Sequence, residues 1–154
     1  RFMPPDDGKV ALVHGDYRLD NLMFSHDNSR IIAVLDWELS TLGHPYADLA
    51  YQCMQMRLPH SSDRTSMSGL LGLDRRSLGI PSEADYVARY CQRMGIAHID
   101  HWQFYLAFSF FRLAAIAQGV AKRASQGNAS NQRAAAAGAM VAPLAQAALA
   151  CLNE

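Results

Sequence analysis

The chain has 154 residues, half of them hydrophobic, and its 14 basic and 14 acidic side chains give a net charge of zero. This length is sufficient for one substantial hydrophobic core, whereas a neutral chain lacks the basic stripe that binds nucleic acid. The longest apolar stretches are interrupted by Gln, Arg, Ser or Pro, which argues against a membrane span. Three widely separated cysteines suit reduced thiols in a cytoplasmic protein better than a disulfide framework or a zinc site.

The first predicted elements are short apolar strands with polar side chains at their ends. Residues 10–13 form one such run, and Asp16 lies on the loop that leaves it. Residues 22–24 and 31–35 form two more, which are separated by a cluster of turn formers and therefore predict an antiparallel hairpin. In that hairpin Asn21 precedes the first strand and Asp36 follows the second, so these side chains lie side by side at the open end.

Three oxygen-bearing side chains are thus expected to meet at one end of a small sheet. Oxygen ligands at a partly open site suit Mg²⁺, which keeps several waters and shares its coordination shell with substrate phosphates. Taken singly, Asp16 could be a turn residue, whereas Asn21 or Asp36 could cap a helix.

The rest of the chain predicts helices. We expect them over residues 45–56, from the Ser82 cap to Gly95, from 101 to about 124 after an Asp100 cap, and over 133–152 with a kink at Pro143. Residues 57–78 are polar, contain Gly, Ser and Pro, and predict a long loop.

Three segments in the same order resemble motifs of the aminoglycoside phosphotransferase family, whose fold is protein-kinase-like. Residues 14–21, HGDYRLDN, resemble the catalytic loop H-G-D-x-x-x-x-N, and residues 35–38, LDWE, resemble the metal-binding segment. Residues 43–50, GHPYADLA, resemble G-D-P-x-x-D-L-A, with His44 where the family commonly has Asp. Independent turn residues have no reason to reproduce all three motifs. The chain after them is more loosely similar to kinase-like domains associated with acyl-CoA dehydrogenases.

The resemblance implies a role for each matching residue. Asp16 would be the catalytic base that accepts the proton of the substrate hydroxyl, and Arg18 would steady the transferring phosphoryl group. Asn21 and Asp36 would bind the Mg²⁺ that bridges the phosphates of ATP or GTP.

Two further residues would support the catalytic loop. The resemblance implies that His14 fixes the loop from within and that Asp48 braces it from the start of the next helix. Neither residue would touch the substrate.

Two parts of a kinase-type enzyme are missing from the sequence, namely a Gly-rich phosphate loop and a strand lysine paired with a helical glutamate. We therefore expect residues 1–154 to form the C-terminal lobe of a longer protein, with the N-lobe absent. The predicted fold is α+β, predominantly α-helical, with the small β-hairpin at the active site. We expect this lobe alone to be inactive and to expose an apolar surface through which it could dimerise.

The function predicted for the parent protein is phosphorylation of a small-molecule hydroxyl by ATP or GTP. The alternative is a pseudokinase that binds nucleotide or serves as a scaffold, and a weaker one is a metal-dependent hydrolase. Residues 57–82 are net basic, which favours an anionic acceptor such as a hydroxyacyl-CoA over a polycation. A solvated basic loop without substrate contact explains the same composition.

Overall fold

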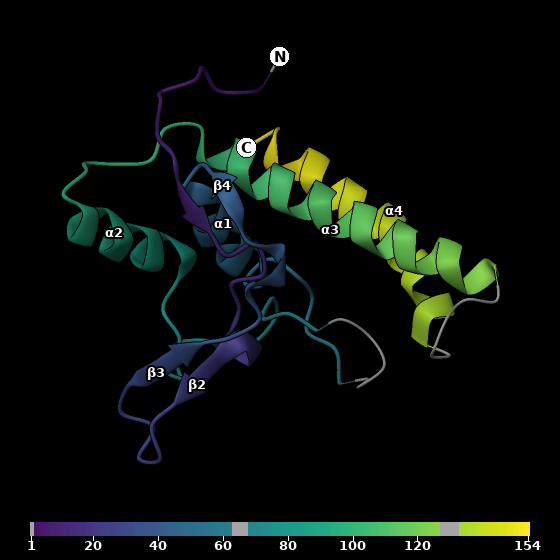
Figure 1. The fold of residues 1–154 in the computed structure, drawn as a ribbon, viewed down its shortest axis with the longest axis horizontal. Coiled ribbons are helices and arrows are strands. Elements are labelled where there is room, and N and C mark those ends of the chain that lie inside the picture. The colour runs from purple at the N-terminus through teal and green to yellow at the C-terminus, as the bar shows by residue number, and fades with distance from the viewer. Residues whose placement is uncertain (1, 63–67, 127–132) are drawn as a thin grey trace.

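The computed structural model describes residues 2–62, 68–126 and 133–154. In Figure 1 a strand-rich part lies beside a pair of long helices, and helix α2 stands apart on the other side. The strands are β1 (Ala11–Val13), β2 (Leu22–Phe24), β3 (Ile31–Val34) and β4 (Thr41–Gly43). The α-helices are α1 (Tyr46–Met54), α2 (Glu83–Met94), α3 (Trp102–Ser125) and α4 (Arg133–Cys151), and the 3₁₀ turns are η1 (Leu19–Asn21) and η2 (Trp37–Leu39).

The strands form two separate antiparallel pairs rather than one small sheet. β2 pairs with β3, so that Leu22 lies opposite Val34, and these strands coincide with the two apolar runs of the sequence. β1 pairs instead with β4, a strand that the sequence did not reveal because it is three residues long and ends in glycine. The β1–β4 pair brings the chain after η2 back beside the loop that follows β1.

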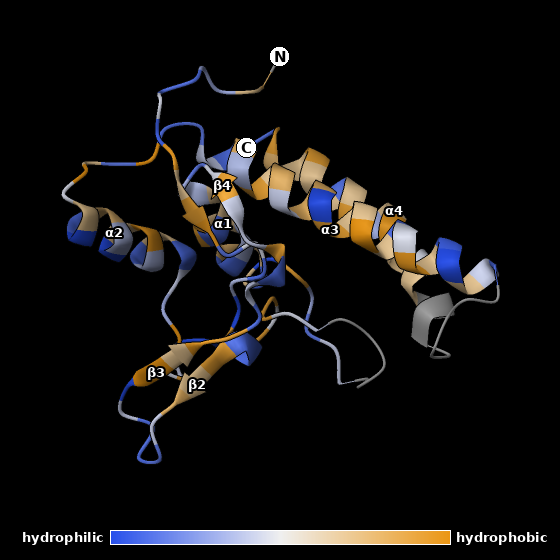
Figure 2. Ribbon diagram, in the orientation of Figure 1, coloured by the Kyte–Doolittle hydropathy of each residue, from blue (hydrophilic) through white to orange (hydrophobic). Residues whose placement is uncertain are grey.

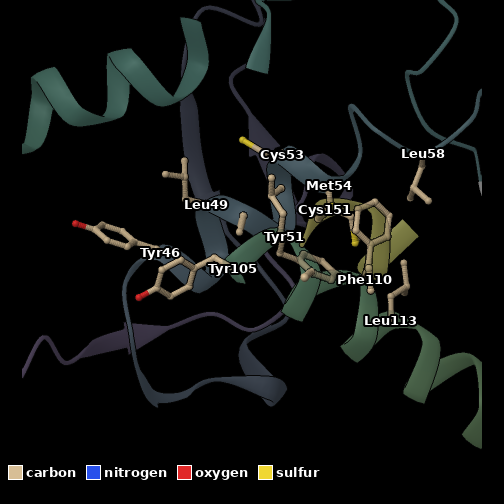
Figure 3. Packing of buried hydrophobic residues seen from close by; sticks show 14 of the residues in the cluster. Tyr46, Leu49, Tyr51, Cys53, Met54, Leu58, Tyr105, Phe110, Leu113 and Cys151 are labelled. Atoms are coloured by element: carbon tan, nitrogen blue, oxygen red, sulfur yellow. The ribbon is translucent and has the colours of Figure 1, made fainter. Parts of the chain in front are cut away.

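The core lies where α1 packs against α3 and where α3 packs along α4. Side chains from these helices interdigitate in Figure 3, with Tyr46 and Tyr105 edge to face at 5.4 Å between ring centroids. The largest side chains that are almost completely buried are Phe110, Met54, Leu106 and Leu144. Burial of this kind contributes about 1.5–3 kcal/mol for each large apolar side chain. The core therefore fixes α1 and α3, the two helices that contact the loop after β1.

Local signals explain the limits of α2 but not the start of α3. Ser82 caps α2 by accepting a hydrogen bond from the Asp85 amide, and Gly95 ends it at φ +67°, as predicted. Asp100 does not cap α3, because its carboxylate pairs with His98 and the helix begins after His101 at φ +55°. The prediction of an Asp100 cap was therefore wrong.

Apolar side chains remain exposed on the strands and on one face of α3. Figure 2 shows hydrophobic colour along β2 and β3 and along much of α3 and α4. Leu12 of β1, Leu42 of β4 and Phe111 of α3 are 63%, 74% and 63% exposed. In the part of the chain that the structure describes, α3 alone has the length and hydropathy of a membrane span, and core helices meet the same criteria.

Candidate active site

The open end of the β2–β3 hairpin places Asn21 opposite Leu35, the residue before Asp36. The Leu35 amide donates a hydrogen bond of 2.8 Å to the Asn21 carbonyl, so the segments before β2 and after β3 are still paired where they leave the hairpin. Asp36 is exposed and adopts φ +65°, a left-handed conformation that non-glycine residues seldom adopt and that often occurs at functional sites.

Asn21 also joins the hairpin to Asp16. Its Nδ2 donates to the Asp16 carboxylate at 3.0 Å and to the Asp16 carbonyl at 2.8 Å, and the Asn21 side chain is buried. With both donors directed at Asp16, the Oδ1 of Asn21 is left as an acceptor for a cation. The structure thus brings Asp16 and Asn21 into direct contact and leaves Asp36 at the same end of the hairpin.

His14 connects this loop to the strand that precedes Asp36. Its ring is buried, and its Nε2 lies 2.7 Å from the Leu35 carbonyl, to which it can only donate. Its Nδ1 accepts from the Asp16 amide at 3.2 Å, so these partners assign the neutral Nε2–H tautomer. Trp37 covers the ring at 4.7 Å between centroids. His14 therefore holds the Asp16 and Asp36 segments in a fixed relation.

Asp48, in the first turn of α1, holds the loop from the other side. One oxygen of its carboxylate accepts from the His14 amide at 2.7 Å and the other from the Gly15 amide at 2.9 Å. Gly15 adopts φ +85°, and a Cβ there would lie 2.4 Å from the Leu39 carbonyl oxygen. Only glycine fits this position, because both the backbone conformation and the close approach of η2 exclude a side chain.

Arg18 is the most exposed of the residues assigned to catalysis. Its Nε lies 3.5 Å from the Asp16 carboxylate and its Nη2 lies 3.6 Å from Asp20, while 45% of its side chain is exposed. These distances are long for hydrogen bonds, so the guanidinium is free to turn towards an incoming anion.

Two residues that the sequence analysis did not select also contact this loop. Arg112 of α3 donates from Nη2 to the Gly15 carbonyl, and its guanidinium lies 5.2 Å from the ring centroid of Tyr51. Burial and the nearby Asp16 carboxylate raise the pKa of Tyr51 to about 12, so the phenol stays protonated. A signal for Tyr51 was present, since it lies one helical turn after Asp48 on the same face of α1.

The donor set is consistent with Mg²⁺ bound together with a nucleotide. The structure contains no cluster of three or more His, Cys, Asp or Glu side chains within residues 2–62, 68–126 and 133–154 that could hold a metal ion. Asn21 and Asp36 would supply two oxygen ligands, which is the number that Mg²⁺ commonly takes from protein when phosphates and waters complete its octahedron.

A carboxylate and an amide at the end of a kinase-type loop, followed by an aspartate across a hairpin, define the class of a kinase-like phosphotransferase. Comparison with known proteins agrees. Residues 1–105 match the model of the phosphotransferase enzyme family, and the chain belongs to that family. A Ralstonia eutropha protein provisionally named an aminoglycoside phosphotransferase has a similar crystal structure, with a TM-score of 0.84 and 48% identity over 94% of this chain and 43% of that one.

Curated relatives agree with the looser resemblance of the later segments. The chain is 49% identical over 142 residues to acyl-CoA dehydrogenase family member 10 of Mus musculus, covering 92% of this chain and 13% of the relative. It is 40% identical over 150 residues to family member 11 of Rattus norvegicus, covering 97% of this chain and 19% of the relative. The chain thus spans less than a fifth of these relatives. The predicted family and the helix-rich, kinase-like fold are confirmed, while the roles of individual residues stay predictions.

Proposed function

We propose that the parent polypeptide of this chain transfers the γ-phosphoryl group of ATP or GTP to a hydroxyl of a small molecule. Membership of the phosphotransferase enzyme family supports phosphoryl transfer in general. The observation that carries the proposal is the Asp16–Asn21 hydrogen bond, because it uses the Asn21 Nδ2 group, leaves the amide oxygen available to a cation and holds the Asp16 carboxylate beside it. This chain alone is proposed to be inactive, since it has neither a Gly-rich loop nor a paired lysine for the phosphates.

In this proposal each part of the loop has one task. Asp16 accepts the proton of the acceptor hydroxyl as its oxygen attacks the γ-phosphorus, and Arg18 binds the oxygens of the transferring group. Asn21 and Asp36 hold Mg²⁺, which when bound neutralises charge on the phosphates. His14 and Asp48 keep the loop in shape through the contacts described above.

A pocket of about 390 Å³ beside the loop is suited to the acceptor. Arg18 and Asp20 lie at one side of it, and Tyr51 and Gln52 of α1 lie at another. The Oε1 atom of Gln52 is buried and has no hydrogen-bond partner among the described residues. Leaving a buried carbonyl oxygen unpaired is costly, so the Gln52 amide would gain a hydrogen bond by turning towards a hydroxyl or N–H group of the bound substrate.

A second pocket, of about 720 Å³, supports an anionic acceptor. Arg75, Arg76 and Arg89 line it together with Asp74 and Asp85. Asp74 accepts a hydrogen bond from the Ser77 amide and Asp85 from the Ser82 hydroxyl, and since both donors are neutral the pocket keeps a formal charge of +1, from three arginines and two aspartates. By contrast, the described residues provide no ion-pair partner for any of the three arginines. Unpaired guanidinium groups around one pocket favour an anion, such as the phosphates of a hydroxyacyl-CoA.

The structure also narrows the set of basic residues on which this prediction was based. Arg57 is excluded from it, because Glu83 and Glu154 neutralise its charge. Residues 63–67, which include Arg64 and Asp63, lie outside the described residues. Of that segment, Arg75 and Arg76 remain, and the anionic-acceptor proposal depends on them together with Arg89 of α2, which lies outside it.

The test is an acceptor screen on the full-length polypeptide with ATP and Mg²⁺, comparing hydroxyacyl-CoA thioesters with kanamycin-like cations. We expect the thioesters to be phosphorylated. In a double variant, Arg75→Gln with Arg89→Gln, their KM should rise by roughly tenfold or more, because each lost charged hydrogen bond costs about 1.5–3 kcal/mol.

The matched control is Arg93→Gln. It removes an exposed arginine of α2, the helix that carries Arg89, outside the pocket lined by the three arginines. Phosphorylation of the cations alone would overturn the anionic acceptor. Tight nucleotide binding without transfer to any hydroxyl would instead favour the pseudokinase alternative.

A further inference from the structure

Arg112 is placed unusually for a charged side chain. It is the only charged residue between Trp102 and Ala121, in the middle of the long, apolar helix α3. The described residues contain no carboxylate within ion-pair distance of it. Its guanidinium instead contacts the Gly15 carbonyl and the face of the Tyr51 ring. A partly buried charge without a counter-ion is costly. The contacts with the Gly15 carbonyl and Tyr51 are therefore what stabilises this charge.

The peptide that Arg112 contacts is the one that carries Asp16. Arg112 holds the carbonyl oxygen of the Gly15–Asp16 peptide, and His14 Nδ1 accepts from its N–H at 3.2 Å. The preceding amide, of Gly15, is held by Asp48 at 2.9 Å. A peptide unit is planar, so holding its oxygen and its hydrogen fixes the plane and places the Cα atom from which the Asp16 side chain extends.

A second route leads from Arg112 to Asp16 through a side chain. The guanidinium stacks on the ring of Tyr51, which is buried and lines the pocket beside Arg18. The Asp16 carboxylate lies close enough to the phenol to act on its ionisation. Displacing Arg112 would therefore loosen both the backbone and the side-chain support of Asp16.

We propose that Arg112 is a positioning residue, through which α3 sets the orientation of the Asp16 carboxylate. The proposal rests on the function proposed above, in which Asp16 accepts the proton of the acceptor hydroxyl. In this arrangement the contacts of Arg112 attach the catalytic loop to the long core helix α3. Errors of about 1 Å in such a group cost on the order of a hundredfold in rate.

The first test is steady-state kinetics of the full-length polypeptide. Arg112→Met keeps the apolar stem but removes the guanidinium, and we expect kcat to fall by roughly 10- to 100-fold. The KM for ATP should change by less than about twofold, because Arg112 does not contact the proposed metal ligands. Arg112→Lys should recover part of kcat, since an ammonium can still donate to the Gly15 carbonyl. Unchanged kcat in Arg112→Met would overturn the proposal while leaving the proposed function intact.

Arg57→Met is the matched control, because it makes the same change at another partly buried arginine. Arg57 pairs with Glu83 and Glu154 and does not contact the loop. We expect this variant to lose thermal stability and to keep kcat at temperatures at which it is folded. A similar loss of kcat in both variants would mean that Arg112 is merely structural.

The second test is amide hydrogen exchange, which does not require activity. In Arg112→Met, exchange over residues 12–18 should accelerate by about tenfold or more, while peptides from α3 and α4 should keep their protection. Arg57→Met should not accelerate exchange in the loop. Uniform acceleration in Arg112→Met, or none in the loop, would overturn the proposal even if no acceptor were ever phosphorylated. A failure to detect transfer by the unchanged protein would count against the proposed function alone.

Discussion

Replacing Asp16 by Asn in the full-length polypeptide is expected to slow phosphoryl transfer by roughly two to four orders of magnitude, the usual contribution of a general base. The amide keeps the shape of the carboxylate but cannot accept the proton of the acceptor hydroxyl. Nucleotide affinity should change little, because Asn21 and Asp36 remain as metal ligands. Rapid-quench or coupled-assay kinetics would measure the loss, and a titration with a nucleotide analogue would measure the affinity.

Replacing Asp36 by Ala should, unlike Asp16→Asn, act mainly on nucleotide affinity. It removes a charged ligand, so binding of the Mg²⁺–nucleotide complex should weaken. The loss should be at least roughly 10- to 100-fold, which is the cost of removing a residue that only orients a metal ligand. Asp20→Asn is the control for nucleotide binding, since Asp20 is a highly exposed carboxylate in the same loop that is not a proposed metal ligand, and nucleotide affinity should stay nearly unchanged. If Asp16→Asn and Asp36→Ala gave the same result in the nucleotide titration, the separation of roles would be wrong.

The hairpin and its open end could be predicted because the signals are local. Two apolar runs on either side of a polar turn predict a hairpin with Asn21 beside Asp36, and the hairpin is present. Its pairing places Asn21 opposite Leu35, one residue short of Asp36, with a shift of register between Met23 and Phe24. The capping of α2 was equally readable, since Ser82 and Asp85 are only three residues apart. The family motifs added what spacing alone does not contain, namely a chemistry for these positions.

The remaining features depend on contacts between distant segments. β4 exists because Thr41–Gly43 meets β1, which is about thirty residues earlier in the chain. The ring of Trp37 lies against that of His14, 23 residues earlier in the chain, while Trp37 remains 44% exposed. Arg112 meets Gly15 across 97 residues of sequence, and periodicity within α3 does not reveal such a contact. Tertiary packing, rather than local propensity, decided these three cases.

A network around Arg57 joins the ends of four helices and should contribute strongly to stability. Arg57, just after α1, pairs through Nε with Glu83 at 2.6 Å and through Nη1 with Glu154 at 2.7 Å. Glu83, at the start of α2, also accepts from the Trp102 indole at 2.9 Å. Burial opposes ionisation of Glu83, but the hydrogen bonds from Arg57 and Trp102 outweigh it and lower the pKa of Glu83.

Glu83→Gln is expected to destabilise the protein by about 2–3 kcal/mol, somewhat less than the cost of breaking a fully buried pair, because 18% of the Glu83 side chain and 26% of the Arg57 side chain remain exposed. Thermal unfolding should show a decrease in Tm of roughly 5–10 °C. The control is Asp100→Asn, which breaks the exposed pair with His98 and should cost less than about 1 kcal/mol.

The same network predicts how stability depends on pH. Because the folded protein lowers the pKa of Glu83 below its usual value of 4.5, the ionised carboxylate stabilises the fold above that value, and this contribution is lost as pH falls through the folded-state pKa. The difference in unfolding free energy between the unchanged protein and Glu83→Gln should therefore be full at pH 7 and shrink steadily below about pH 4.5. Urea unfolding at a series of pH values measures it. A difference that stayed constant down to pH 3 would show that Glu83 stabilises the helix ends by packing rather than by its charge.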